Sequence, residues 1–300
     1  IMSLSIFFYK KNLWHITKSK VKSYIFNKNS FSGPEILITN LIKGLTKKKI
    51  KFELNKITPE TKKILFIDDK NNLKKLINSS AKIYIGPNIM TMPYDDKIFT
   101  SNKILKVLVP SNWIKKKYLK QAQKKIAKID IWYSGVDEKN WCPDRKVSKK
   151  IDYLIYLKFT YDKKIFNNIV NYLNSKNKTI KIIKYGTYNR TQYLDLLRSS
   201  KALIFISQSE SQGISNFEAW SCNVPTIVFN PGYWIYKNKK YISNSCPYLS
   251  KQTGIYFRNF KDFKKKISSF KSSQFSARKW ILKKGTIDFT SKKLINILKI

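Results

Sequence analysis

Residues 202–229 contain two apolar runs separated by a polar segment, and this arrangement constrains the fold more than any other stretch of the chain. The runs, at 202–206 and 226–229, have the pattern of buried strands. Residues 207–225 between them form a polar stretch followed by a short helix-compatible segment. We therefore predict a strand, a loop, a helix and a strand, with the loop at the carboxyl end of a strand, where open α/β sheets bind ligands.

Glu210 and Glu218 lie in this segment, and between residues 196 and 261 they are the only acidic side chains. If the helix begins near Gly213, Glu218 lies about one turn inside it, while Glu210 stays on the loop at the mouth of the sheet. The first N–H groups of such a helix lack intrahelical partners and favour an anion such as a phosphate. These groups belong to Gly213, Ile214 and Ser215.

A second interpretation of the two carboxylates needs no ligand. Glu210 is then an exposed loop acid, and Glu218 is an acid that the positive end of the helix dipole favours. The residues of the loop alone leave both interpretations open, so the decision depends on the wider pattern.

The segment resembles the carboxy-terminal signature of retaining GT-B glycosyltransferases of the glycosyltransferase family 4 type. The shared pattern has two Glu with seven residues between them, Gly213 inside, Ala219 and Trp220 after them, and residues 223–225 closing the helix. The resemblance implies an α/β fold of GT-B type, with two Rossmann-like doubly wound domains facing across a cleft. It also implies that a C-terminal helix crosses back onto the first domain.

In that family the first Glu contacts the donor sugar and the second binds the nucleotide ribose, so the resemblance implies these roles for Glu210 and Glu218. It further implies that backbone N–H groups hold the donor diphosphate at Gly213, Ile214 and Ser215. The donor would be a UDP- or GDP-linked sugar, which is a substrate and not a resident cofactor. The acceptor would be a glycan or another glycoconjugate.

Two lysines follow a strand predicted at residues 153–157. The family places an Arg after this strand and a Lys five residues later, both reaching the donor diphosphate, and Lys158 and Lys163 stand at that spacing. Lys in place of Arg keeps the charge but loses the bidentate fork. Because Lys is so frequent in this chain, a chance match at either position is the alternative. Together with Glu210, these two lysines are the candidate catalytic residues.

The first half of the chain matches the family less closely. Gly33 precedes an apolar periodic segment, where the family has a Gly-rich loop that approaches the donor phosphates or the acceptor. A plain helix start is the alternative for Gly33. Many relatives carry a His at the end of a middle strand, where this chain has Asn88, whose side chain can hydrogen-bond a sugar hydroxyl. The sole histidine, His15, lies far earlier and is expected to be structural.

Alternating strand and helix patterns along the chain agree with two doubly wound domains. Ser111 is expected to cap a helix that follows the strand at 107–109. Domains are expected at residues 1–143 and 144–288, with the C-terminal helix at 289–300. Further strands are predicted at residues 6–8, 50–54, 64–67, 83–85 and 180–184. Helices are predicted at residues 33–45, 71–78, 165–173, 192–198, 261–270, 274–282 and 290–298.

The formal charge of +42 invites a nucleic-acid interpretation. However, only five of the 60 basic residues are Arg, which leaves 55 Lys. Arg supplies the bidentate contacts of base and phosphate readout, so its scarcity argues against a specific nucleic-acid partner. Lys, Asn and Ile are also the residues of A/T-rich codons. Genome composition is therefore favoured over a selected polyanion surface, and attraction to anionic membrane lipids is a third explanation.

The spacing of the cysteine and acidic residues argues against several classes of metal site and against a disulfide framework. The three Cys, at positions 142, 222 and 246, form no CxxC pair, which excludes a zinc ribbon and a disulfide framework. No apolar run approaches the roughly 20 residues that a membrane helix needs, and the opening residues lack a leader's basic segment. We therefore expect a cytoplasmic protein without a membrane anchor. No two acidic residues are spaced i, i+2, as in the Asp-x-Asp of metal-dependent enzymes, so no metal is expected.

The sequence thus predicts a metal-independent, retaining, hexosyltransferase-like enzyme that moves a sugar from a nucleotide-sugar to a glycan, lipid or protein-linked acceptor. Because a nucleoside diphosphate departs as an anion, the site must stabilise negative charge with cations and oriented N–H groups. The alternative is a Lys-rich polyanion- or nucleic-acid-binding protein on a degenerate glycosyltransferase scaffold. Dependence of the activity on Glu210 separates the two.

Overall fold

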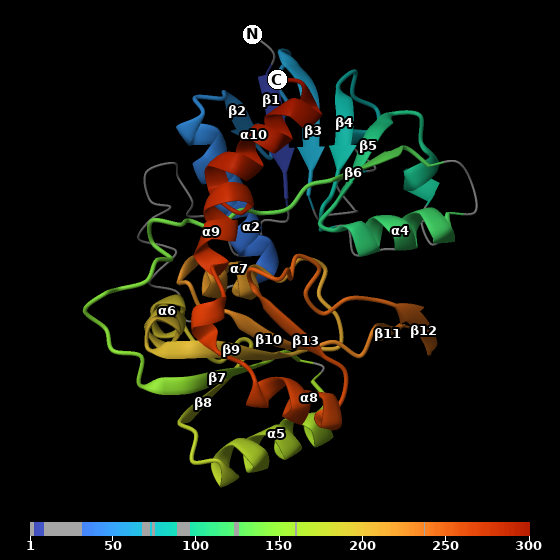
Figure 1. Cartoon of the computed structure of the whole chain (residues 1–300). Helices are drawn as coiled ribbons and strands as arrows, with labels where there is room; N and C mark the ends of the chain where they lie inside the picture. Colours follow the sequence, from blue (N-terminus) through green and yellow to red (C-terminus); the bar gives the residue numbers. More distant parts are fainter. Residues whose placement is uncertain are drawn as a thin grey trace. The chain divides into compact units, whose positions relative to one another are not determined.

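Figure 1 shows the computed structural model of the chain, which describes residues 3–8, 32–67, 73, 76–88, 97–122, 126–159, 161–236 and 238–300. Its contacts divide the chain into two compact units. The first takes Ile1–Lys20, Pro34–Ser134 and Ile287–Ile300, and the second takes Val21–Gly33 and Gly135–Thr286. The domain limits expected at residues 143 and 288 stay a prediction.

The first unit contains a parallel six-stranded sheet in the order β2-β1-β3-β4-β5-β6. Its continuous apolar runs are typical of parallel strands that are covered on both faces, and Leu4, Ile64 and Ile83 are fully buried. The strands are β1 (Ser3–Phe7), β2 (Phe52–Leu54), β3 (Thr61–Phe66), β4 (Lys82–Ile85), β5 (Ile104–Val109) and β6 (Lys128–Ile131). Its helices within the described residues are α2 (Gly33–Lys47, whose first residue belongs to the second unit), η2 (Lys97–Thr100), α4 (Asn112–Gln121) and α10 (Ile287–Leu298).

α10 is anchored to the first unit by side chains from several elements. Lys63 of β3 donates from Nζ to two carbonyl groups at the end of α10, each at 2.7 Å, where a cation complements the helix dipole. Trp132 donates from Nε1 to the carbonyl oxygen of Thr290 at 2.9 Å. A Cβ on Gly44 of α2 would lie 1.8 Å from Ser291 Oγ, so only glycine permits this close approach of the two helices. The C-terminal helix therefore belongs to the first unit.

The second unit contains a parallel five-stranded sheet in the order β13-β10-β9-β7-β8 and a separate two-stranded sheet. The strands are β7 (Ile151–Leu157), β8 (Ile180–Lys184), β9 (Ser200–Ile206), β10 (Thr226–Phe229), β11 (Tyr233–Tyr236), β12 (Lys239–Ile242) and β13 (Gly254–Phe257). The helices are α5 (Lys163–Ser175), α6 (Arg190–Arg198), α7 (Ile214–Ser221), α8 (Phe260–Ser268), η3 (Ser272–Gln274) and α9 (Ala277–Lys284).

The two faces of the second sheet bury alternate residues of its strands. Ile155 and Ile204 belong to a core that also contains Ile169 of α5 and Phe263 of α8. On the opposite face Tyr156 stacks on a neighbouring aromatic ring and lies 5.5 Å from the ring of Tyr193 on α6. Helices therefore cover both faces, as in a doubly wound fold.

The strand order of the second unit creates a switch point between β7 and β9. β7 connects outward through α5 to β8, whereas β9 connects through α7 to β10 on the other side. The two strands are paired so that Leu157 lies opposite Ile206, the last residue of each strand. The segments that leave these strands therefore start at the same edge of the sheet, where doubly wound folds bind ligands.

The predicted α/β pattern is confirmed along most of the described chain, with boundaries within a few residues. Half of the helix predicted at 71–78 lies outside the described residues, and His15 lies wholly outside them. Ser111 occupies the N-cap position of α4, as predicted, although its side chain makes no capping hydrogen bond. None of the described helices combines the length and the apolar character needed to cross a membrane.

Candidate active site

Lys158 and Glu210 meet at the switch point of the second sheet. Lys158 follows β7 directly, and its Nζ lies 2.9 Å from Glu210 Oε1. Glu210 is fixed on the loop after β9 because its backbone N–H donates to the carbonyl oxygen of Asn244 at 2.9 Å. The side chains of the two ions are only 22% and 11% exposed, so the pair lies in partly dehydrated surroundings.

Tyr185 completes the surroundings of Lys158. It follows β8, the other neighbour of β7, and its backbone N–H donates to the carbonyl oxygen of Leu157 at 2.8 Å. Lys158 Nζ lies 4.0 Å from the centre of the Tyr185 ring, which is a cation–π contact. The Tyr185 hydroxyl accepts a hydrogen bond of 3.3 Å from the backbone N–H of Gly33, a residue of the second unit. Tyr185, which the sequence did not single out, therefore contacts both Gly33 and Lys158.

The charge of Lys158 is set by two opposing effects. Burial lowers its pKa because it disfavours the charged ammonium. The Glu210 carboxylate, through its charge and its hydrogen bond, outweighs burial and holds the pKa of Lys158 above its usual range. Lys158 is therefore protonated at neutral pH and can stabilise negative charge that develops beside it.

Gly213 precedes α7 and sets the direction of the helix start. It has φ 84° and ψ 60°, in the left-handed region that glycine adopts without a Cβ clash. A Cβ at this position would lie 2.9 Å from Nδ2 of Asn216, one turn into the helix. Ile214 and Ser215, both half-buried, form the first turn. The helix thus begins inside the predicted interval, with its positive end at the predicted anion-binding N–H groups.

Glu218 is buried in the second turn of α7 and forms an ion pair with Arg190. Arg190 Nη2 lies 2.7 Å from Glu218 Oε1, and the side chains are 8% and 3% exposed. The guanidinium also lies over the ring of Trp141, with its carbon 4.7 Å from the ring centre. Burial raises the pKa of Glu218, and the nearby Arg190 charge opposes that rise. The sequence does not predict the role of Arg190, because no local pattern indicates a partner that lies 28 positions away along the chain.

Tyrosine side chains surround the buried ion pair. The hydroxyl groups of Tyr156 and Tyr188 are 2.6 Å apart, and the Tyr188 ring lies 5.2 Å from that of Tyr193. Tyr193 donates from its hydroxyl to the carbonyl oxygen of Ser215 at 3.0 Å, which joins α6 to the first turn of α7. The aromatic cluster therefore holds the first turn of α7, and with it the helix that carries Glu218, against α6.

Two predicted residues lie apart from this group. Lys163 is the first residue of α5 and is exposed, and among the described residues no ion pair joins it to Glu210. Asn88 is a half-buried residue of the first unit, two positions after Gly86. Within the described part of the chain its Nδ2 is buried without a hydrogen-bond partner. The structure thus places Lys158, Glu210 and Gly33 in one group, with Gly213 at the N-cap of α7 and Glu218 within that helix.

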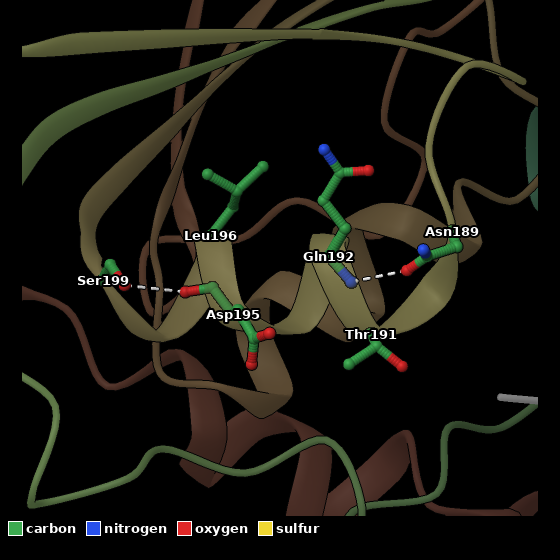
Figure 2. Close-up of a pocket in the computed structure, with 6 residues that line it drawn as sticks. All are labelled: Asn189, Thr191, Gln192, Asp195, Leu196 and Ser199. Atoms are coloured by element: carbon green, nitrogen blue, oxygen red, sulfur yellow. Dashed lines mark hydrogen bonds between the residues drawn. The ribbon is translucent and has the colours of Figure 1, made fainter.

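A separate hollow of about 440 Å³ lies along α6. Figure 2 shows its six lining residues, which are Asn189, Thr191, Gln192, Asp195, Leu196 and Ser199. Two of its polar side chains are already used in hydrogen bonds at the ends of the helix, at 2.8 Å each. None of the predicted site residues lines this hollow. The described residues also contain no group of three or more side chains suited to hold a metal ion.

By sequence, no protein family and no curated protein matches the chain. Several solved structures match it in three dimensions. A sucrose-phosphate synthase from Thermosynechococcus elongatus superposes with a TM-score of 0.63 at 8% identity, covering 100% of this chain and 98% of that one. The apo form of the lipopolysaccharide outer core galactosyltransferase WaaB gives a TM-score of 0.60 at 12% identity, covering 98% of each chain.

A third match is TarM of S. aureus in complex with fondaparinux, α-GlcNAc-glycerol and UDP. It gives a TM-score of 0.57 at 16% identity and covers 88% of this chain and 59% of that one. The solved structures named here are glycosyltransferases of the GT-B type. The chain therefore has the GT-B fold, as the sequence predicted.

Proposed function

We propose that this chain is a retaining glycosyltransferase of the family 4 type, which transfers a hexose from a UDP- or GDP-linked donor to a glycan, lipid or protein-linked acceptor. The observation that carries the proposal is the Lys158–Glu210 ion pair at the switch point of a GT-B unit, on the loop that leads into α7. The interpretation of Glu210 as an exposed loop acid does not account for its ion pair with a partly buried lysine at this edge of the sheet. Glu210 and Lys158 are therefore better explained as parts of a ligand site.

The chemistry follows from the charge of the leaving group. When the bond between the sugar and the diphosphate breaks, its electron pair leaves with the diphosphate, and the sugar becomes oxocarbenium-like. The Lys158 ammonium and the N–H groups at the start of α7 would stabilise the departing anion. Arrival of the diphosphate gives Lys158 a second anionic partner, so Glu210 becomes available for the sugar hydroxyls. Lys163 would reach the same diphosphate only from its exposed position on α5.

The nucleoside side of the donor would lie toward Glu218. Arg190 occupies Oε1 of Glu218, so we assign the contact with the ribose to the second carboxylate oxygen. Burial raises the pKa of Glu218, and the Arg190 charge opposes that rise, which favours the ionised carboxylate that accepts hydrogen bonds from ribose hydroxyls. The UDP bound to TarM supports a nucleotide donor for a protein of this fold.

Nucleotide and donor binding tests this division of roles. Isothermal titration with UDP, GDP and their hexose conjugates would be compared for wild type, Glu210→Gln and Asp195→Asn, an equal change of charge at an exposed acid on α6. We expect Glu210→Gln to keep the affinity for the free nucleotide, and to lose about tenfold or more in affinity or turnover of the intact donor, as for a lost hydrogen bond to a charged group. Equal loss of free nucleotide and donor in Glu210→Gln would contradict the assignment.

Metal independence is part of the proposal and rests on the missing Asp-x-Asp. Turnover of the donor should survive EDTA, and complete loss of turnover that a divalent ion restores would contradict this point.

The Lys-rich polyanion-binding alternative gains no support from the glycosyltransferases that share the fold. Tight, sequence-selective oligonucleotide binding that is unchanged in Glu210→Gln would favour that alternative.

A further inference from the structure

A β-hairpin leaves the second unit between β10 and β13 and forms a sheet of its own. β11 and β12 pair only with each other among the described strands, antiparallel, with Tyr233 opposite Ile242 and Ile235 opposite Lys240. Figure 1 shows both strands projecting from the body of the second unit. A two-stranded hairpin is marginally stable by itself in water. A projecting hairpin of this kind is stabilised when it packs against another surface.

One face of the hairpin exposes aliphatic side chains. Directly opposed residues of an antiparallel pair share a face, so Tyr233, Ile235, Lys240 and Ile242 lie together. Ile242 is 83% exposed and Ile235 is 54% exposed. Ile242 is the most exposed of the large apolar residues in the described part of the chain. Exposed apolar side chains that lie together on one face are candidates for an interaction site.

Aromatic rings and lysines lie on both faces of the hairpin. Trp234 and Tyr241 pair across the other face, with ring centres 6.2 Å apart. Lys240 Nζ lies 4.1 Å from the centre of the Tyr233 ring, and Lys239 is exposed at the start of β12. Residues 233–242 contain no acidic side chain. Every charge on the hairpin is therefore positive.

We propose that the β11–β12 hairpin docks on an anionic lipid membrane. Trp and Tyr favour the headgroup region of a bilayer, aliphatic side chains favour the acyl boundary, and lysines are attracted to anionic lipids. The hairpin combines all three in ten residues and has no acid that an anionic surface would repel. Nucleic acid explains the lysines but not the two exposed isoleucines. The inference does not depend on the proposed glycosyltransferase activity.

The base of the hairpin is connected to the loop that carries Glu210. Directly after β12, Ser243 donates from its backbone N–H to the carbonyl oxygen of Gly232, at 3.1 Å, which closes the hairpin. Ser245 donates from Oγ to the carbonyl oxygen of Ser207 at 2.9 Å, and Asn244 accepts the N–H of Glu210. A lipid-bound hairpin would therefore hold the candidate active site close to the membrane surface.

Vesicle flotation of the full chain tests the proposal. Vesicles of pure phosphatidylcholine and of phosphatidylcholine with 30% phosphatidylglycerol would be compared at about 0.1 and 0.5 M NaCl, salt concentrations that separate screened charge attraction from apolar insertion. The test variant is Ile235→Ser/Ile242→Ser, which keeps the net charge. The matched control is Leu119→Ser/Leu282→Ser, because these leucines are 55% and 52% exposed elsewhere on the chain.

Wild type should bind the anionic vesicles more tightly than the neutral ones. The Ile235→Ser/Ile242→Ser variant should bind them about tenfold more weakly, because two side chains no longer enter the acyl boundary. The leucine control should stay within about twofold of wild type, since the proposal gives those leucines no contact with lipid. Because all four side chains are on the surface, thermal melting should confirm that every variant folds.

A second pair of variants isolates the charge. Lys239→Ser/Lys240→Ser should weaken binding more than Lys264→Ser/Lys265→Ser, an equal loss of charge on exposed positions of α8. Equal effects of both lysine pairs, together with equal effects of the isoleucine and leucine pairs, would mean that general positive charge binds the vesicles. That result, or an absence of binding to anionic vesicles by wild type, would overturn the proposal.

Discussion

Replacing Glu218 by leucine leaves the Arg190 guanidinium inside the second unit without its carboxylate. The two groups are 2.7 Å apart, and their side chains are 3% and 8% exposed, so water and salt screen the lost interaction only weakly. Breaking a buried ion pair by removing one partner costs about 3–5 kcal/mol. Each kcal/mol lowers the Tm of a unit of roughly 150 residues by about 2–4 °C. We therefore expect Glu218→Leu to lower the Tm by about 6–20 °C.

Differential scanning calorimetry of the full chain measures this shift, with Asp152→Asn as the matched control. Asp152 forms an ion pair of nearly the same length, 2.8 Å, with Lys201, but those side chains are 21% and 51% exposed. Exposed pairs contribute about 0–1 kcal/mol to stability. The control should therefore lower the Tm by less than about 4 °C.

The partner substitutions separate a lost pair from a stranded charge. In Glu218→Leu/Arg190→Met both charges are gone and apolar groups fill the space, so most of the lost stability should return. Arg190→Met alone removes the cation that opposes the burial-driven rise of the Glu218 pKa. When a carboxyl has a raised pKa in the folded state, the free energy of unfolding of the protein falls as the pH rises through that pKa. The Arg190→Met variant should therefore be more stable at pH 5 than at pH 7. Equal Tm losses in Glu218→Leu and Asp152→Asn, or a double variant that loses the sum of the single losses, would refute the reasoning.

Two further predictions concern lysines in unusual surroundings. Tyr185→Leu should reduce donor turnover by about 2- to 30-fold, because it removes the cation–π contact with Lys158. Tyr185→Phe should reduce turnover less, because the ring remains. Equal losses of turnover in steady-state assays would exclude the ring as the group that positions Lys158. Burial lowers the pKa of Lys117 to about 8, so the unfolded state binds more protons between that value and about 10.5, and stability should rise with pH across this window. Lys117→Met should stabilise the protein at pH 7 and flatten that rise, because the variant has no ammonium to dehydrate. Urea denaturation at pH 7 and 10 measures the free energy of unfolding, and an equal pH dependence in wild type and variant would contradict the prediction.

The two strands that flank residues 207–225 were predictable because they form continuous apolar runs. Residues 202–206 and 226–229 lie in β9 and β10, whose buried positions select Ile, Val, Leu and Phe. The start of α7 was predictable because a glycine precedes a short amphipathic segment, and its φ of 84° explains that glycine. The alternation of strands and helices predicted doubly wound domains, whereas the GT-B type was implied by the resemblance of the segment from Glu210 to Pro225 to glycosyltransferases.

Other parts of the site depend on strand order, which the sequence does not carry locally. Tyr185 contacts Lys158 only because β8 is the outer neighbour of β7, so a residue 27 positions later lies over the ammonium. Arg190 reaches Glu218 for the same reason, across the packing of α6 on α7. The hairpin of β11 and β12 was missed because aromatic residues and lysines replace the apolar runs that mark buried strands.

The hydrogen bond from the Glu210 N–H to the Asn244 carbonyl oxygen connects the loop of the candidate active site to the base of the β11–β12 hairpin. If the sugar donor orders the loop of Glu210 and an anionic bilayer orders the hairpin, this hydrogen bond couples the two events. Linkage requires the two effects to be equal, so a sugar donor and an anionic bilayer would raise each other's affinity by the same factor. The chain would then hold its donor most tightly where it is already attached, and release it more readily when free in solution.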